Sequence, residues 1–528
     1  MTINSLTFLI FFTVLVVLYY LPIFKNCQWV LLLLASFVFY GSASSGSVIY
    51  LLVASVATYF GANLLEKKNV KQETYLKENK GSLSKQEVKE YKGKIKKEKH
   101  KITVVCVVVN LGLLILIKYG LFLAKNVELV FKNIKITELS IFHIIIPLGI
   151  SYYTLMSIGY LLDVSKGKCK AEKNLLKTVL YLIYFPQITQ GPIGRFTEMA
   201  PRLFEKHEFT YEKLAYGCQR ILWGFFKKMV IADRMKPMVD AIFTNYQDYS
   251  GFTVALGCIY FSIQLYADFS GYMDIVCGCS HILGIELAEN FKRPFFSKSL
   301  AEFWRRWHIT LCAWFRDYMF YPLSISKGAV RAGRIAKKIF PPRIAKLAPS
   351  VFALSIIWLC TGIWHEASWR YILWGVYNGV IIIGAMCLEP QFAWAREKLH
   401  LKEENKVWSA FQMIRTFLII SLLKVFPLAG STMDSIRMFL KIFTDFRVEF
   451  TVAAWFPQLQ ITDYVAVGAG LIIFFIVSTI QEKGPAHEKL NKLPFVVRFA
   501  IYFVLLLGIL SFGVFDVEMA GGFEYAQY

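Results

Sequence analysis

"VFALSIIWLCTGIW", residues 351–364, is a continuous run of apolar and small uncharged side chains. The stretch "FAIYFVLLLGILSFGVF", residues 499–515, has the same character. Strands of a membrane barrel alternate between lipid-facing and lumen-facing side chains, so continuous runs favour helices that cross the bilayer. These stretches therefore predict an α-helical membrane protein.

The rest of the chain repeats this pattern. Of its 528 residues 56% are hydrophobic, and the mean hydropathy is +0.47, well above an ordinary soluble protein. We expect helices at 6–24, 28–41, 47–65, 102–124, 141–162, 175–191, 214–232, 250–285, 350–364, 370–388, 411–429, 463–480 and 495–515. Because the second run is short and 250–285 is long enough to break in two, the predicted fold is an all-α polytopic bundle of about eleven spans.

The formal net charge of +22 lies mostly between the apolar runs. This placement indicates membrane topology rather than nucleic-acid binding. Residues 66–101 and 326–346 are expected as basic cytoplasmic loops that also contact anionic lipid headgroups. An acidic protein partner would also find complementary charge on the second loop. We expect one membrane-embedded domain over residues 1–528.

Two classes of function are disfavoured by what the sequence lacks. The ten cysteines are scattered, with only Cys277 and Cys279 close together, and show no zinc-ligand spacing, so no metal site is expected. No internal repeat is visible, which weakens the interpretation as a secondary transporter.

The N-terminal residues 1–21 lack a basic segment and a cleavage site, and are expected to be retained as a first span.

Residues 290–323 mix aromatic and charged side chains, which excludes a simple lipid-facing span. Ser299 with Glu302 three residues later is typical of a capping box and predicts that a helix begins there. Two interpretations stay open for this helix. It is either a re-entrant helix that lines an internal cavity, or an interfacial helix whose Trp and Arg side chains anchor to headgroups.

His365 and Glu366 stand in an apolar region, where an ionisable side chain should face the bundle interior, a cavity or a partner. A neutral imidazole is well suited to deprotonate a hydroxyl that attacks an activated carbonyl, and to return the proton to the leaving group. His365 is therefore a candidate general base. The alternative is a histidine that only packs in the core.

Five blocks, in order along the chain, carry a resemblance to a known family. They are "PLGISYYTLMSIGYLLDV" (147–164), "YFPQITQGPIGRF" (184–196), "IQLYADFSGYMDIVCG" (263–278), the aromatic and basic block at 290–323, and "TGIWHEASWRYILWGVYNG" (361–379). On these blocks the chain resembles the membrane-bound O-acyltransferase family. The similarity is to its bacterial branch of alginate O-acetylase-like and teichoic-acid D-alanyltransferase-like proteins.

The resemblance implies transfer of a small acyl group, with acetyl favoured, to hydroxyls of an extracytoplasmic polysaccharide in a bacterial cell membrane. The donor would be a cytoplasmic thioester, acetyl-CoA or an acyl carrier protein. The family's two signature histidines fall on His308 and His365, and the second corresponds to the family's catalytic residue. His308 would bind substrate, position His365, or only orient the site. The family usually has glycine after the catalytic histidine, whereas this chain has Glu366.

Further candidates for substrate binding are Arg305, Arg306, Arg316, Asp268, Ser270, Tyr266 and Asn378. The arginines offer bidentate contacts to phosphate, or pair with nearby carboxylates. An acid at the depth of Asp268 is costly enough to require a partner such as an arginine, or a place in a cavity wall.

We therefore expect a helical bundle around a central tunnel, in which the thioester enters from the cytoplasm and the acceptor, or a partner transferase, approaches from outside. A covalent acyl-enzyme is not required, because the sequence places no serine or cysteine beside His365. Cys360 would lie off its helical face. D-alanyl transfer to teichoic acid by the same chemistry remains an alternative. A membrane transporter and a non-enzymatic scaffold are the alternatives from other classes.

Overall fold

The computed structural model describes residues 1–131, 137, 146–402 and 404–515. The regular elements of these residues are helices, and Phe291 and Trp307 add an isolated antiparallel bridge. Eight helices in the described part of the chain are long and apolar enough to cross a membrane. They are Val48–Glu78, Lys85–Val130, Gly251–Ile282, Pro342–His365, Trp369–Cys387, Lys406–Leu428, Ile461–Glu482 and Phe495–Phe512. The prediction of a polytopic helical bundle is confirmed.

Eight is fewer than the eleven spans expected, because several apolar runs form shorter helices. The first two runs form α1 (Leu6–Tyr20) and α2 (Gln28–Ser44), with 15 and 17 residues. A helix needs about 20 residues to cross the hydrocarbon layer. Residues 141–145 of the predicted run 141–162 lie outside the described residues, and residues 150–162 lie in α6 (Ile150–Ser165).

The chain forms two compact units. The first comprises residues 1–214 and 279–288, and the second comprises residues 215–278 and the chain from 289 onwards. The sequence pattern does not indicate this division. The expectation of a single acyltransferase domain concerns function and stays a prediction.

The first unit is built from α1, α2 and the helices that follow them. These are η1 (Pro22–Phe24), η2 (Ser45–Ser47), α3 (Val48–Glu78), α4 (Lys85–Leu114), η3 (Ile115–Tyr119), α5 (Gly120–Val130), α6, α7 (Leu175–Ile183), α8 (Phe185–Ile188) and α9 (Phe196–Phe204), and α10 (Tyr211–Phe225) begins at its end.

The second unit holds most of α10 and the longer series of helices. These are η5 (Phe226–Ala232), α11 (Asp233–Thr244), α12 (Gly251–Ile282), η6 (Pro294–Phe296), α13 (Leu300–Arg306), α14 (Ile309–Phe315), η7 (Arg316–Phe320), α15 (Tyr321–Ser324), α16 (Lys327–Ile339), α17 (Pro342–His365), α18 (Trp369–Cys387), α19 (Glu389–Lys398), α20 (Lys406–Leu422), α21 (Val425–Leu428), α22 (Thr432–Thr444), α23 (Val452–Trp455), α24 (Ile461–Glu482), α25 (Ala486–Asn491) and α26 (Phe495–Phe512).

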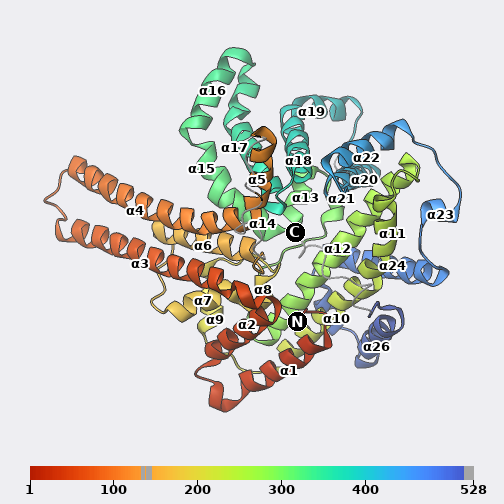
Figure 1. Cartoon of the computed structure of the whole chain (residues 1–528), viewed down its shortest axis with the longest axis horizontal. Helices are drawn as coiled ribbons and strands as arrows, with labels where there is room; N and C mark the ends of the chain where they lie inside the picture. Colours follow the sequence, from red (N-terminus) through yellow and green to blue (C-terminus); the bar gives the residue numbers. More distant parts are fainter. Residues whose placement is uncertain (132–136, 138–145, 403, 516–528) are drawn as a thin grey trace. The chain divides into compact units, whose positions relative to one another are not determined.

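The basic segment 66–101 is a helical hairpin and not a loop, which corrects the expectation from sequence. Helices α3 and α4 extend through it side by side (Figure 1). Lys68 pairs with Glu98 at 2.7 Å, and the rings of Tyr75 and Tyr91 stack with centroids 3.9 Å apart. Hydropathy does not predict these two paired helices, because a polar helix with many charges has the same composition as a loop. Its cytoplasmic side stays a prediction.

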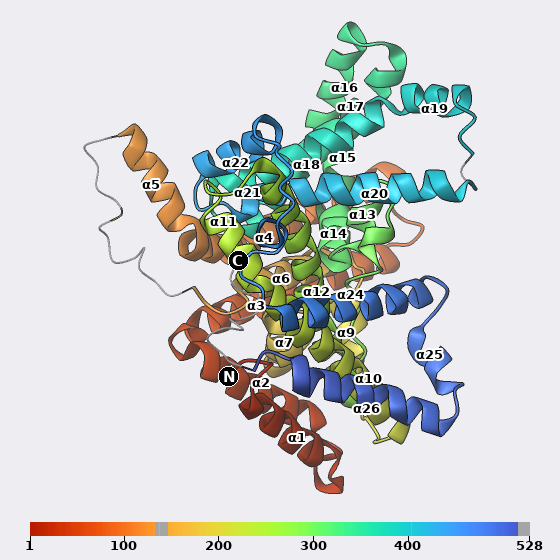
Figure 2. The same cartoon turned by 90° about the vertical axis from the view of Figure 1, so that its right-hand side faces the viewer.

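The second basic segment, 326–346, is also helical rather than a loop. The Ser326 hydroxyl accepts a hydrogen bond from Ala329 N at 3.2 Å and starts α16, and Pro342 begins α17. Proline suits a first helical turn because its missing N–H would have no partner there. Helices α16 and α17 lie side by side in both views (Figure 2).

Helix α12 is one continuous helix of 32 residues, so the predicted break within 250–285 does not occur. Its glycines allow neighbouring helices to approach closely and do not bend the helix. A Cβ added at Gly271 would lie 2.9 Å from the carbonyl oxygen of Gly224 on α10. Glycine here permits close helix packing, so it favours continuity rather than a kink.

The outer helices expose apolar side chains. Only 6% of the 18-residue apolar segment of α26 is buried, and Phe495, Phe499 and Val504 are all exposed. A large apolar surface of this kind is unfavourable in water, and monomeric soluble proteins rarely expose one. It is favourable in contact with the hydrocarbon of a membrane. The chain is a multi-pass membrane protein.

Candidate active site

His365 is the last residue of α17 and is 7% exposed. Its ring packs edge-on against Trp364 and Trp374, with centroids 5.0 and 5.1 Å away, and lies nearly parallel to Tyr371 at 5.9 Å. An imidazole held by three aromatic rings keeps one orientation, which is what a positioned acid–base group requires.

His365 lines a small cavity of about 30 Å³ in the second unit. The other lining residues are Phe261, Leu265, Trp304, Trp307, Tyr371, Trp374, Lys424 and Pro427. This volume holds one or two water molecules. The wall is therefore aromatic, with an imidazole and an amine as its strongest polar groups.

The packing of α17 against α18 fixes His365 relative to Tyr371. A Cβ on Gly362 would lie 2.4 Å from the carbonyl oxygen of Tyr371, and one on Gly375 would lie 2.4 Å from that of Trp358. Real Cβ atoms essentially never approach other atoms so closely. Glycine at both positions lets the two backbones touch.

Gly362→Ala should therefore separate α17 from α18 and destabilise the protein. Overpacking of a tight contact costs about 1–3 kcal/mol, and the thermal midpoint in detergent should fall. Gly384→Ala on α18 is the matched control, because its added Cβ meets nothing within 4 Å. A Gly362→Ala midpoint equal to that of Gly384→Ala would contradict this account of the interface.

Glu366 and Arg370 form an ion pair with each other, one helical turn apart. Both carboxylate oxygens of Glu366 accept from Arg370 Nη2, at 3.0 and 2.9 Å. Arg370 Nη1 also donates to the carbonyl oxygen of Ala429. The two charges next to His365 thus neutralise each other, and Glu366 is held by Arg370 at the end of α17.

His308 lies at a break between α13 and α14. The predicted helix does begin at Ser299, whose hydroxyl accepts from Glu302 N at 3.2 Å. It ends at Arg306, however, and His308 adopts a left-handed backbone with φ of 47°. A non-glycine residue in this conformation is uncommon and clusters at functional sites.

Asn290 organises the surroundings of His308. Its Oδ1 accepts from His308 Nδ1 at 3.2 Å, from Thr310 N at 3.0 Å and from Thr310 Oγ1 at 2.9 Å. Because an amide oxygen only accepts, Nδ1 of His308 carries a proton in this arrangement. His308 is 1% exposed, and its ring lies 6.2 Å from that of Trp364, which also contacts His365.

Burial lowers the pKa of His308 from 6.5 to about 3, since no water stabilises the imidazolium. As the pH falls below 6.5, His308 binds a proton in the unfolded chain but stays neutral in the folded chain. Folding stability that is fully present above pH 6.5 is then lost at about 1.4 kcal/mol per pH unit. Between pH 7.5 and 5, the melting temperature of the intact protein should fall further than that of His308→Gln. Equal falls would contradict a neutral buried His308.

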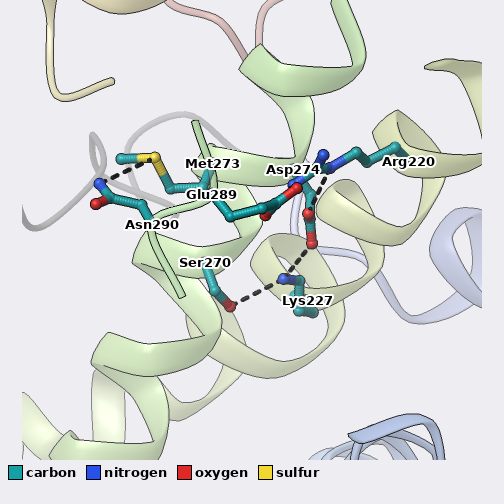
Figure 3. A network of polar contacts seen from close by, with 7 residues as sticks. All are labelled: Arg220, Lys227, Ser270, Met273, Asp274, Glu289 and Asn290. Atoms are coloured by element: carbon teal, nitrogen blue, oxygen red, sulfur yellow. Dashed lines mark hydrogen bonds and ion pairs between the residues drawn. The ribbon is translucent and has the colours of Figure 1, made fainter. Parts of the chain in front are cut away.

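Asp268 and Ser270 each bond to a buried lysine of η5. Lys228 Nζ lies 2.7 Å from Asp268 and 2.8 Å from Asp233. Lys227 donates to Ser270 at 2.9 Å and pairs with Asp274 at 2.5 Å (Figure 3). Asp268 therefore has the partner that its depth requires, although that partner is a lysine and not an arginine.

Figure 3 shows that this network continues outward from Asp274. Arg220 bonds to Asp274 at 2.9 Å and to Glu289 at 2.7 Å. The π-helical turn η5 places two consecutive lysines toward α12. These contacts tie α10, η5 and α12 together.

The other candidates lie in three settings. Arg305 is exposed, Arg316 pairs with Asp317 at 2.8 Å, and Arg306 pairs with Glu302 at 2.8 Å and Glu482 at 2.7 Å. Tyr266 is buried among aromatic rings, including that of Trp307, which lines the cavity. Asn378 is fully buried and donates to the Trp374 carbonyl oxygen at 2.8 Å. Their roles in substrate binding stay predictions.

Lys424 is the cavity residue that the sequence analysis missed. It stands in the apolar run "ISLLKVFPLAG", residues 420–430, so the signal that selected His365 was present there as well. Asn290 gave no comparable signal, because its contact with His308 depends on a chain reversal that periodicity does not show.

Comparison with known proteins finds a family match for part of the chain. Residues 172–334 match the sequence model of the MBOAT, membrane-bound O-acyltransferase family. These residues are similar to membrane-bound O-acyltransferases. The matched range includes His308, whereas His365 lies beyond its end on α17.

Proteins similar to this chain include one named as a probable alginate O-acetylase from Azotobacter vinelandii. It is 34% identical over 273 residues, which are 52% of this chain and 51% of the relative. A peptidoglycan O-acetyltransferase of Helicobacter pylori is 30% identical over 56% of each chain. A teichoic acid D-alanyltransferase of Bacillus subtilis is 30% identical over 44% of this chain and 58% of its own. The chain spans about half the length of the curated relatives it matches.

Proposed function

We propose that this protein is an O-acyltransferase that moves a small acyl group from a thioester to a hydroxyl of a cell-surface polysaccharide. The observation that carries the proposal is His365, buried at the end of α17 in an aromatic cavity of a chain that is similar to membrane-bound O-acyltransferases. The relatives are named as transferases of acetyl or D-alanyl groups. We propose the bacterial plasma membrane as its location.

In the proposed reaction, His365 acts as general base. It removes the proton of the acceptor hydroxyl while the oxygen attacks the thioester carbonyl carbon, and it returns the proton to the thiolate that leaves. A general base that serves a buried reaction must be kept in one orientation and away from bulk water. The rings of Trp364, Tyr371 and Trp374 support both requirements.

Acetyl is the proposed acyl group, with acetyl-CoA or an acyl carrier protein as the donor. Two of the relatives are named for O-acetylation, one as a probable alginate O-acetylase and the other as a peptidoglycan O-acetyltransferase. D-alanyl transfer to teichoic acid is the second candidate, and the relative from Bacillus subtilis supports it.

The test measures esters on the cell surface. Polymers from cells with and without the full-length protein are treated with mild alkali, and released acetate and D-alanine are quantified separately. We expect acetate release to depend on the protein and D-alanine release not to. The reverse result would establish D-alanyl transfer, and unchanged release of both would overturn the proposed function.

A further inference from the structure

Lys424 is a buried cation at the candidate active site. It lies between α20 and α21, is 6% exposed, and lines the same cavity as His365. Its ammonium lies 5.3 Å from the ring centre of Trp307 and 5.8 Å from that of Trp374. Trp374 also packs against the His365 ring, so the amine and the imidazole lie beside one indole.

Two other buried lysines show how this chain normally accommodates such a group. Lys227 is 3% exposed and pairs with Asp274, and Lys228 is 1% exposed and pairs with two carboxylates. In the residues that the structure describes, no carboxylate or other hydrogen-bond acceptor reaches the Lys424 ammonium. Its neighbours there are aromatic faces.

Aromatic faces stabilise an ammonium only in part. A cation–π contact recovers only a small part of the free energy lost when an ammonium leaves water. The ammonium is therefore complementary to an anion that arrives in the cavity. The space is about 30 Å³, which suits a single oxygen-bearing group.

The reaction proposed above creates such a group, and the following inference rests on that proposed function. We propose that Lys424 is a catalytic residue that binds the thioester carbonyl oxygen and stabilises the oxyanion formed when the acceptor hydroxyl attacks. The new C–O bond forms as the carbonyl π electrons move to oxygen, and His365 takes the hydroxyl proton. On collapse, the electrons return, the C–S bond breaks, and the thiolate takes the proton from His365.

The same ammonium would act differently if it bound a permanent anion of a substrate, such as a donor phosphate. Charge that develops only in the transition state affects kcat, whereas a contact that already exists in the ground state affects KM. A thioester donor without phosphate distinguishes these two roles of Lys424. S-acetyl-N-acetylcysteamine presents the same carbonyl as acetyl-CoA but has no phosphate.

The experiment compares intact protein, Lys424→Met and Lys406→Met as full-length chains in membrane vesicles. De-esterified surface polymer is the acceptor, and the thiol released from each donor is measured. Lys406 is an exposed residue at the start of α20, the helix that precedes Lys424, so its replacement controls for the loss of one lysine. For Lys424→Met we expect kcat to fall about 100-fold with both donors, and KM to change by less than about threefold. Lys406→Met should match the intact protein.

Thermal stability distinguishes catalysis from a structural role. Methionine fills a similar volume without a buried charge, so the melting temperature of Lys424→Met should stay equal or rise. A lower melting temperature with kcat retained would overturn the proposal, as would a higher KM confined to acetyl-CoA. If the intact protein releases thiol from neither donor, the proposed function itself fails, whereas full activity of Lys424→Met refutes only the role of Lys424.

Discussion

His365→Ala should lower acyl transfer by about 10²–10⁴-fold, the range expected when a general base is removed. The acceptor hydroxyl is a weak nucleophile, and its attack on the thioester carbonyl depends on the loss of its proton. The cavity wall offers no other side chain suited to take that proton if Lys424 is charged. The measurement is alkali-released acetate from surface polymers, divided by the amount of protein in the membrane fraction.

His365→Gln and His400→Ala make this result specific. Glutamine keeps much of the shape and hydrogen bonding of histidine but cannot act as a base, so it should be as inactive as alanine. His400 is an exposed histidine after α19, and its replacement should leave acetate release unchanged. A His365→Gln protein with activity near that of the intact chain would exclude His365 as the base.

Lys228→Met is expected to destabilise the protein by about 3–5 kcal/mol, the usual cost of removing one partner from a buried ion pair. Lys228 is the cation between Asp233 and Asp268, and all three side chains are at most 2% exposed. Without it, two carboxylates would face each other away from water. The measurement is the thermal midpoint in detergent, supported by the yield of folded protein.

Neutralising the carboxylates tests this explanation directly. Lys228→Met combined with Asp233→Asn and Asp268→Asn should recover most of the lost stability, because no buried charge remains unpaired. Lys25→Met removes an exposed ion pair with Glu208, which solvent screens, and should leave the thermal midpoint nearly unchanged. A triple variant as unstable as Lys228→Met would contradict the electrostatic explanation.

The sequence predicts those features that depend on local composition. The apolar runs predicted a helical membrane protein, the Ser299 cap predicted the start of α13, and the cost of charge in hydrocarbon predicted that His365 would be buried. Each of these follows from the residues themselves and their near neighbours.

Features that depend on distant partners were not predictable in this way. Asp268 required a partner, but only the π-helical turn η5 shows that Lys228 supplies it. Residues 66–101 look like a loop because their helices bury little apolar surface. Lys424 joins His365 through packing between elements about 60 residues apart in sequence, which no periodicity records.

The glycine contact between α17 and α18 has a consequence for how substrate enters. Backbones that touch through Gly362 and Gly375 cannot move closer together, and they hold His365, Tyr371 and Trp374 as one rigid wall. A cavity that holds one or two waters must widen to admit a thioester. The widening is then left to the other lining elements, which are α12, the segment with Trp304 and Trp307, and the α20–α21 segment that carries Lys424. In the proposed mechanism, chemistry waits until the cavity closes around the acyl group.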